Sequence, residues 1–114
     1  MQKNLRLRKN RDYQRVYRRG KSLAMPLAAL VYMQSNGWGK KAGFSVSKKV
    51  GNAVTRNKVR RRMKEIVRPH MPRIKRDVHM IFVARPLAAS ATFDELDKTI
   101  AKLLKRSKLE VDEA

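Results

Sequence analysis

Several features on which other functional classes depend are missing from the sequence. It contains no cysteine, which excludes disulfide bonds, cysteine-type zinc sites and thiol catalysis. No apolar run approaches the roughly 18 to 20 residues that cross a bilayer, and residues 1–19 lack the apolar core of a secretion signal. Since 114 residues leave room for one domain and little else, we expect residues 1–114 to form a single cytoplasmic domain without membrane contact.

Acidic residues are also scarce, and they are unevenly placed. Lys and Arg total 29 against 9 Asp and Glu, which gives a formal net charge of +20. Six of the nine acids follow residue 91, whereas residues 13–64 hold fourteen Lys or Arg and no acid. A surface that only needs solubility mixes both signs, so this segregated block predicts a binding face for a polyanion. Residues 1–9, taken alone, also fit a disordered basic arm.

Hydrophobic periodicity and turn residues predict the secondary structure. In chain order the expected elements are a helix over 10–20, strands over 22–33 and 41–47, a helix over 54–68, a strand over 77–85 and a helix after 92. Asn10 is the expected N-cap of the first helix, and Thr92 opens a capping box with Glu95. A turn over 35–39 predicts a hairpin between the strands that flank it, and residues 106–114 predict a flexible tail.

The expected helix over 54–68 carries two opposed faces. Its apolar stripe, which runs from Val59 to Val67, predicts packing against a core. The opposite face is a basic ridge of Asn57, Arg60, Arg61, Lys64 and Arg68, flanked by Arg56, Lys58 and Arg62. Like charges four residues apart each cost about 0.2 to 0.5 kcal/mol in an isolated helix, so we infer that bound phosphates offset the repulsion. Backbone amides near Thr55 offer a further anion site.

Two tyrosines lie on one face of the expected first helix. If that helix packs beside the strands, Tyr13 and Tyr17 would offer flat rings to unpaired bases. Core packing with the hydroxyl group at the surface explains the same spacing equally well. The sequence therefore leaves both interpretations of these two side chains open.

No arrangement of residues indicates that this chain carries out catalysis itself. His70 and His79 have no acid at local spacing that could orient an imidazole ring. Asp77 fits a turn or the edge of a strand better than a magnesium site. Such a chain is expected to bind rather than to catalyse.

The most specific signal lies where the second strand meets the basic helix. Residues 43–49 read GFSVSKK, and residues 51–61 read GNAVTRNKVRR. This block closely resembles the signature of the bacterial ribonuclease P protein component. The resemblance extends over residues 4–106 and includes DYQRVY at 12–17 and the strand that follows Asp77.

The resemblance implies both a fold and a function. The fold would be α+β, with a four-stranded sheet, the order α-β-β-β-α-β-α and a left-handed crossover, although such crossovers are generally right-handed. Proteins of this family assist a catalytic RNA, which itself removes the 5′ leader of precursor tRNA by magnesium-dependent hydrolysis. The implied partners are therefore ribonuclease P RNA and precursor tRNA, and Mg²⁺ would be held through the RNA subunit.

The resemblance also implies two sets of contact residues. The set that would face the catalytic RNA is Lys48, Arg56, Asn57, Lys58, Arg60, Arg61, Arg62 and Lys64. The set that would line a leader-binding cleft between the basic helix and the sheet is Tyr13, Tyr17, Ser45, Ser47 and Lys49. A gapless match puts Val31 where the family has a further aromatic residue. Tyr32, one residue on, would then point to the other face of the sheet.

Two other classes of protein would also account for the net charge of +20. One is a ribosomal-type RNA-binding protein or RNA chaperone, and the other is a nucleoid-type DNA-binding protein. No helix-turn-helix or zinc pattern supports a DNA reader, so we expect no DNA partner. Trp38 has no predicted role beyond an exposed position in a loop.

Overall fold

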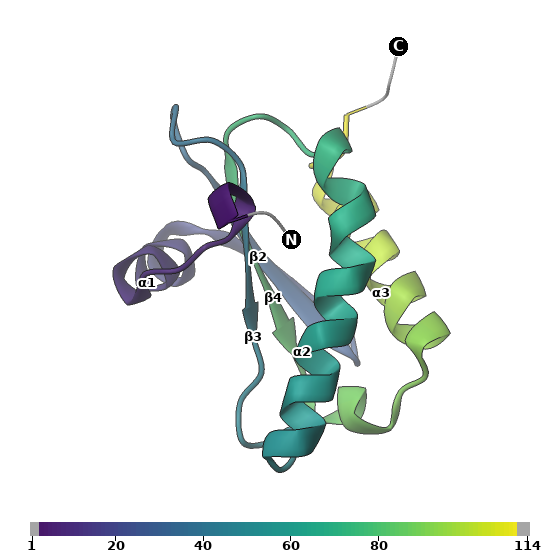
Figure 1. Ribbon diagram of the computed structural model, residues 1–114. Helices are drawn as coiled ribbons and strands as arrows, with labels where there is room; N and C mark the ends of the chain where they lie inside the picture. The colour runs from purple at the N-terminus through teal and green to yellow at the C-terminus, as the bar shows by residue number, and fades with distance from the viewer. Residues whose placement is uncertain (1–2, 112–114) are drawn as a thin grey trace.

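The computed structural model describes residues 3–111 and shows a sheet with helices on both of its faces (Figure 1). Its elements in chain order are the 3-10 helix η1 (Lys3–Leu5), α1 (Asn10–Arg19), β1 (Lys21–Ala24), β2 (Ala28–Gln34), β3 (Lys41–Ser45), α2 (Ala53–Val67), the 3-10 helix η2 (Arg68–Arg73), β4 (Val78–Ala84), the 3-10 helix η3 (Pro86–Ser90) and α3 (Phe93–Ser107). This order confirms the expected α+β class. No helix among the described residues is both long and apolar enough to cross a membrane.

The four strands form a mixed sheet in the order β1-β2-β4-β3. The pairs β1/β2 and β2/β4 are antiparallel, whereas β3 and β4 are parallel and are joined through α2. In Figure 1, β3 runs down the near edge, α2 returns upward beside the sheet, and β4 runs down behind β3. The crossover is therefore left-handed, as the family resemblance implied.

The predicted hairpin around residues 35–39 is wrong, because β4 lies between β2 and β3. The hairpin of this fold joins β1 and β2 instead, with the amide of Met25 donating to the carbonyl of Ala28 at 2.9 Å. β4 is apolar on both faces, and most of its residues are buried. A central position in the sheet covers both faces of such a strand, so β4 pairs with β2 and β3 lies at the edge of the sheet.

Two hydrophobic clusters fill the two sides of the sheet. On one side α1 packs through Val16 against Val31 and Ile81. On the other side α2 and α3 enclose the larger cluster, which includes Met63 and Phe82. Alternate residues of each strand supply the two clusters, because successive side chains of a strand point to opposite faces.

Side-chain caps begin the helices α2 and α3. Asn52 accepts the amide of Thr55 at 2.9 Å, and the predicted capping box of α3 is confirmed, with Thr92 and Glu95 bonded reciprocally. The N-cap of α1 is Lys9 rather than Asn10, and Lys9 makes no side-chain cap. The difference is one residue, which is the usual uncertainty of a helix boundary.

Both ends of the described chain pack against the domain. Leu7 is buried, and its amide donates to the carbonyl of Ala42 at 2.9 Å, so the chain before α1 runs along the edge strand β3. After α3, the buried Leu109 accepts the amide of Lys75 at 2.9 Å. Residues 106–111, which belong to the segment expected to be a flexible tail, continue α3 to Ser107 and then place Leu109 in the core. Residues 112–114 lie outside the described part.

Candidate nucleic-acid interface

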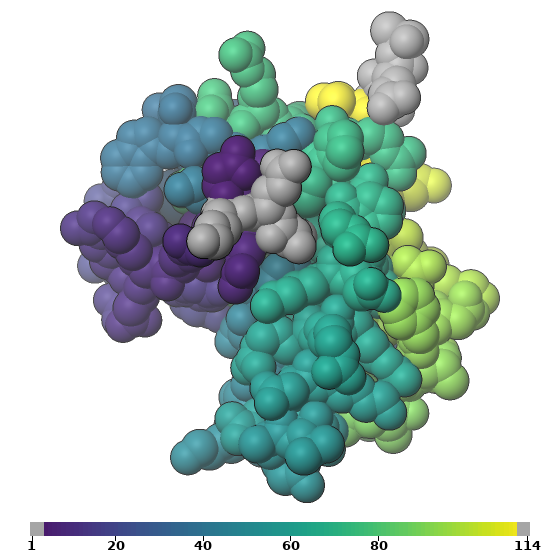
Figure 2. Space-filling view, viewed as in Figure 1, coloured from purple at the N-terminus to yellow at the C-terminus, as the bar shows by residue number. Residues whose placement is uncertain are grey.

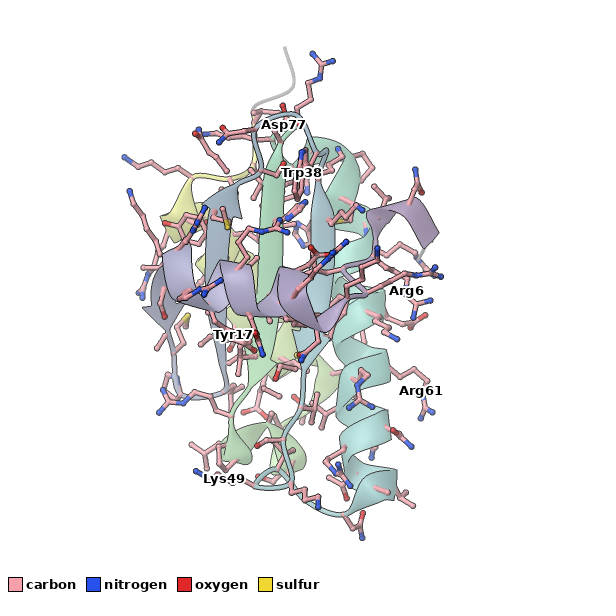
Figure 3. The ribbon with its side chains drawn as sticks, turned by 90° about the vertical axis from the view of Figure 1, so that its left-hand side faces the viewer. Arg6, Tyr17, Trp38, Lys49, Arg61 and Asp77 are labelled. Atoms are coloured by element: carbon pink, nitrogen blue, oxygen red, sulfur yellow. The ribbon has the colours of Figure 1, made fainter. Side chains whose placement is uncertain are left out.

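The outer side of α2 presents the basic ridge to solvent. Asn57, Lys58 and Arg61 are exposed, and Arg61 projects freely from the helix (Figure 3). Arg60 donates to the side-chain oxygen of Asn57 at 2.9 Å, which orients its guanidinium group along the helix. The apolar stripe beneath, from Val59 to Val67, is buried as predicted. The ridge is thus held by a rigid helix that is anchored in the core.

One edge of the basic ridge, extended by Arg56, forms a less exposed row of cations. Arg56, Arg60 and Lys64 follow each other at a spacing of four residues and are half-buried. Burial lowers the pKa of Lys64, and the charges of Arg6 and Arg60 lower it further. The chain before α1 therefore adds Arg6 to this row, and Arg6 and Arg61 project from the same flank of the molecule (Figure 3). A bound polyanion would relieve this repulsion.

Two expected contacts with RNA already have partners inside the protein. Arg62 donates to the carbonyl of Ala91 at 3.2 Å, which ties α2 to the segment before α3. The amide of Thr55 is occupied by Asn52, so the N-terminus of α2 offers one donor fewer to an anion than the sequence predicted.

Tyr13 is an anchor of α1 rather than a free ring. Its hydroxyl oxygen accepts the amide of Phe44 at 3.1 Å, and its ring packs with the cluster under α1. A Cβ atom at Gly43 would lie 2.6 Å from the Tyr13 hydroxyl oxygen, so the helix docks here only because residue 43 has no side chain. The core interpretation is the better one for Tyr13.

Tyr17 is 46% exposed and projects from α1 over a part of the sheet that no helix covers (Figure 3). One row of paired residues crosses all four strands there, namely Ala24, Ala29, Val83 and Ser45. Residues paired directly share a face, so this row lies on the same face as the residues under α1. Figure 2 shows the outline of the molecule hollowed below α1. We call this hollow, with Tyr17 above and that row as its floor, the α1 recess.

The expected position of the cleft is corrected by this geometry. We expected the cleft between the basic helix and the sheet, but core residues such as Val59 and Phe82 fill that space. The recess lies on the other face, beside α1. Ser47, Lys48 and Lys49 are exposed in the loop that follows β3, and Lys49 lies at the end of the recess (Figure 3).

Tyr32 is turned away from the recess. It packs with the cluster under α2 and α3, and its partner in β4 is Met80, which belongs to that cluster. On the α1 side, β2 presents Val31 instead, which is 8% exposed. The strand register therefore removes Tyr32 from the leader-binding candidates.

The histidines and Asp77 have local structural surroundings. Asp77 accepts the amide of Gly39 at 3.0 Å and so fixes the loop between β2 and β3, as its predicted place at a strand edge allows. His79 is buried, and burial together with Lys41 lowers its pKa. His70 lies 3.2 Å from Glu110, an acid forty residues away that local spacing could not reveal. A hydrogen bond at Asp77, a contact with Glu110 at His70 and burial at His79 give each of these groups a structural role.

Comparisons with known proteins agree on one family. The family model described as Ribonuclease P matches residues 1–108. Ribonuclease P protein components from Alkaliphilus metalliredigens and Clostridium novyi are 38% and 41% identical, and each alignment covers 96% of this chain and 98% of the relative. The structure of the Staphylococcus aureus RNase P protein superposes with a TM-score of 0.86 at 32% identity, covering 94% of this chain and 98% of that one. The chain belongs to the ribonuclease P protein family.

A ribonuclease P protein is one component of an endoribonuclease that matures tRNA, and membership implies the ribonuclease P RNA as its partner. Within residues 3–111, no group of three or more His, Asp or Glu side chains could hold a metal ion.

Sequence reasoning missed two parts of the ribonuclease P protein surface. Arg6 joins the flank of α2 only because the chain before α1 pairs with β3. The floor residues Ala24 and Val83 carry no chemical signal of their own, and only the strand register brings them together. One available signal was Gly43, since a glycine inside a strand marks a close approach by another group.

Proposed function

We propose that α2 binds the catalytic RNA of ribonuclease P and that the α1 recess holds the single-stranded 5′ leader of precursor tRNA. The observation that carries this proposal is the exposed ring of Tyr17 over a floor of small side chains, next to a basic helix. A helix with cations alone would fit any polyanion. An open aromatic ring beside it fits an unpaired strand.

The ridge on α2 suits a large folded RNA. Its cations lie on one rigid helix, so binding phosphates orders their side chains but needs no ordering of the backbone. Each neutralised phosphate releases counterions, which makes such binding depend steeply on salt. The guanidinium groups of Arg60 and Arg61 can hold two phosphate oxygens each, which lysine cannot do.

The α1 recess suits one strand of RNA. The row of paired residues beneath Tyr17 offers a stacked base the small side chains of Ala24, Ala29 and Val83. Ser45 offers a hydroxyl group at the floor. Ser47 and Lys49, further along the same end, can reach the ribose and phosphate groups. The recess reads no base edge by this arrangement, so its binding should tolerate many leader sequences.

The protein positions the leader and supplies positive charge, and it contributes no catalytic group. The hydrolysis, and the Mg²⁺ that serves it, belong to the RNA subunit. Beside that RNA, the positive charge of the protein lowers the repulsion between the catalytic RNA and the precursor tRNA. The α1 recess lies close to the ridge, because only the edge strand β3 separates the recess from the chain before α1, which carries Arg6. We place this work in the cytoplasm, where precursor tRNA is made.

The proposal is tested by reconstituting the protein with a bacterial ribonuclease P RNA. The double variant Arg60→Gln/Arg61→Gln should weaken association with the catalytic RNA, whichever substrate is present. Tyr17→Leu should leave that association unchanged and weaken the binding of precursor tRNA but not of mature tRNA. Lys102→Gln, which removes an exposed charge from α3, is the matched control. Equal losses for precursor and mature tRNA in Tyr17→Leu would overturn the assignment of the recess.

A further inference from the structure

Trp38 is a large apolar side chain that the domain leaves uncovered. It is 61% exposed, and it is the only tryptophan in the chain. It lies in the loop between β2 and β3, at the opposite end of the molecule from Lys49 (Figure 3). None of the interactions assigned above uses it.

The loop that carries Trp38 is held firmly. Asp77 accepts the amide of Gly39 at 3.0 Å through its side chain and the amide of Ser35 at 3.0 Å through its carbonyl group. The hydroxyl group of Ser35 donates to the carbonyl of Gly39 at 2.7 Å, which closes the loop on itself. Gly37 and Gly39 adopt positive φ angles that other residues rarely take. Trp38 is therefore presented in one position rather than on a free tip.

Arg15 holds one face of the indole ring. Its guanidinium carbon lies 4.4 Å from the ring centroid, a cation–π contact, and Asp12 fixes the same guanidinium through an ion pair of 2.8 Å. With one face taken and most of the side chain exposed, the other face of the ring is open. Lys41, the first residue of β3 after this loop, pairs with His79 of β4 and places a second cation close to the loop.

We propose that the open face of Trp38 stacks on an unpaired nucleobase of the catalytic RNA. Fixed, flat and flanked by cations, the ring has the two components of a single-strand contact, namely a stacking platform and a positive field. The net charge of +20 disfavours a second copy of the chain as the occupant. This inference rests on the proposed function, since it requires a ribonuclease P RNA as partner.

The base is assigned to the catalytic RNA rather than to the leader because α1 separates the two sites. In Figure 3, α1 crosses the sheet with the uncovered floor and Lys49 on one side of it and Trp38 on the other. A leader in the α1 recess would have to cross the outer side of α1 to reach the indole ring. A separate segment of the catalytic RNA can contact Trp38 without crossing that helix.

A lone tryptophan gives the proposal a direct readout, because its fluorescence reports only this site. Catalytic RNA alone should quench the indole emission, and the quenching should saturate together with binding measured by the anisotropy of labelled RNA. Trp38→Leu should weaken binding of that RNA roughly 5- to 100-fold, whereas Trp38→Phe should keep part of the affinity because it can still stack. Leu87→Ala, which changes another exposed apolar residue, is the control and should bind as the unchanged protein does.

The outcomes separate this inference from the proposed function. RNA that binds without quenching Trp38, in a protein whose Arg60→Gln/Arg61→Gln variant binds weakly, overturns the stacking site and leaves the role of α2 intact. Quenching that appears only after precursor tRNA is added overturns the assignment to the catalytic RNA. Equal losses in Trp38→Leu and Trp38→Phe overturn stacking as the contact. Thermal unfolding of each variant shows whether the domain still folds.

Discussion

Tyr13 and Tyr17 share one helix face, yet the structure assigns them opposite properties, and this difference can be measured. Tyr17 is 46% exposed and faces the α1 recess, whereas Tyr13 accepts the amide of Phe44 at 3.1 Å. Tyr17→Leu should therefore change leader binding without changing stability. Tyr13→Phe should change stability with little effect on leader binding.

The expected magnitudes follow from these contacts. Loss of one base stack costs about 1 to 3 kcal/mol, so Tyr17→Leu should weaken leader binding about 5- to 150-fold. Surface substitutions usually move stability by less than about 0.5 kcal/mol. Tyr13→Phe removes the acceptor of a partly buried amide, which should cost about 1 kcal/mol of folding free energy, or roughly 4 °C in Tm.

The assay pairs two measurements on each variant. Affinity for precursor and mature tRNA is measured with the reconstituted complex, and stability is measured by urea unfolding of the free protein. The reasoning is refuted if Tyr17→Leu lowers stability as much as Tyr13→Phe does, or if Tyr13→Phe loses leader affinity as strongly as Tyr17→Leu does. Either result would mean that the two rings have the same role.

Three further changes test other parts of the structure. Arg61→Gln should reduce the slope of log affinity against log salt for the catalytic RNA by about 0.7 to 0.9, whereas Arg106→Gln, at the end of α3, should not; binding titrations at several salt concentrations decide this. Gly43→Ala should destabilise the fold by about 1 to 3 kcal/mol in urea unfolding, because its Cβ would meet the ring of Tyr13, and the cost should shrink in a Tyr13→Ala background. Burial lowers the pKa of His79, so the unfolded chain binds its proton more readily; the free energy of unfolding should fall as pH drops below about 6.5, and His79→Leu should flatten this dependence in urea unfolding from pH 5 to 8.

The sequence predicted the features that local patterns control. The stripe from Val59 to Val67, the ridge opposite it and the capping box of Thr92 depend on neighbours within four residues, and all three are present in the structure. The order of the strands was not predictable in the same way. The turn at 35–39 looks the same whether β3 pairs with β2 or is displaced by β4, and the choice depends on the burial of a strand forty residues later.

The candidate site also combines features that local patterns predict with features that depend on distant contacts. The cations of α2 were read directly from the sequence, because helical spacing puts them on one face. Which tyrosine is open, and where the recess lies, depended on Gly43 and on the register of four strands. Arg6 joined the flank of Lys64 through a single bridge to Ala42. Contacts between distant segments have no local signal, so they entered only with the structure.

The most direct test of the account compares how tightly the reconstituted ribonuclease P binds precursor and mature tRNA, with and without this protein. If the α1 recess holds the leader, the protein should tighten binding of precursor tRNA and leave the affinity for mature tRNA nearly unchanged. Shortening the leader from its 5′ end should remove this gain. An equal gain for both tRNAs would contradict the account, because it would place the action of the protein away from the leader.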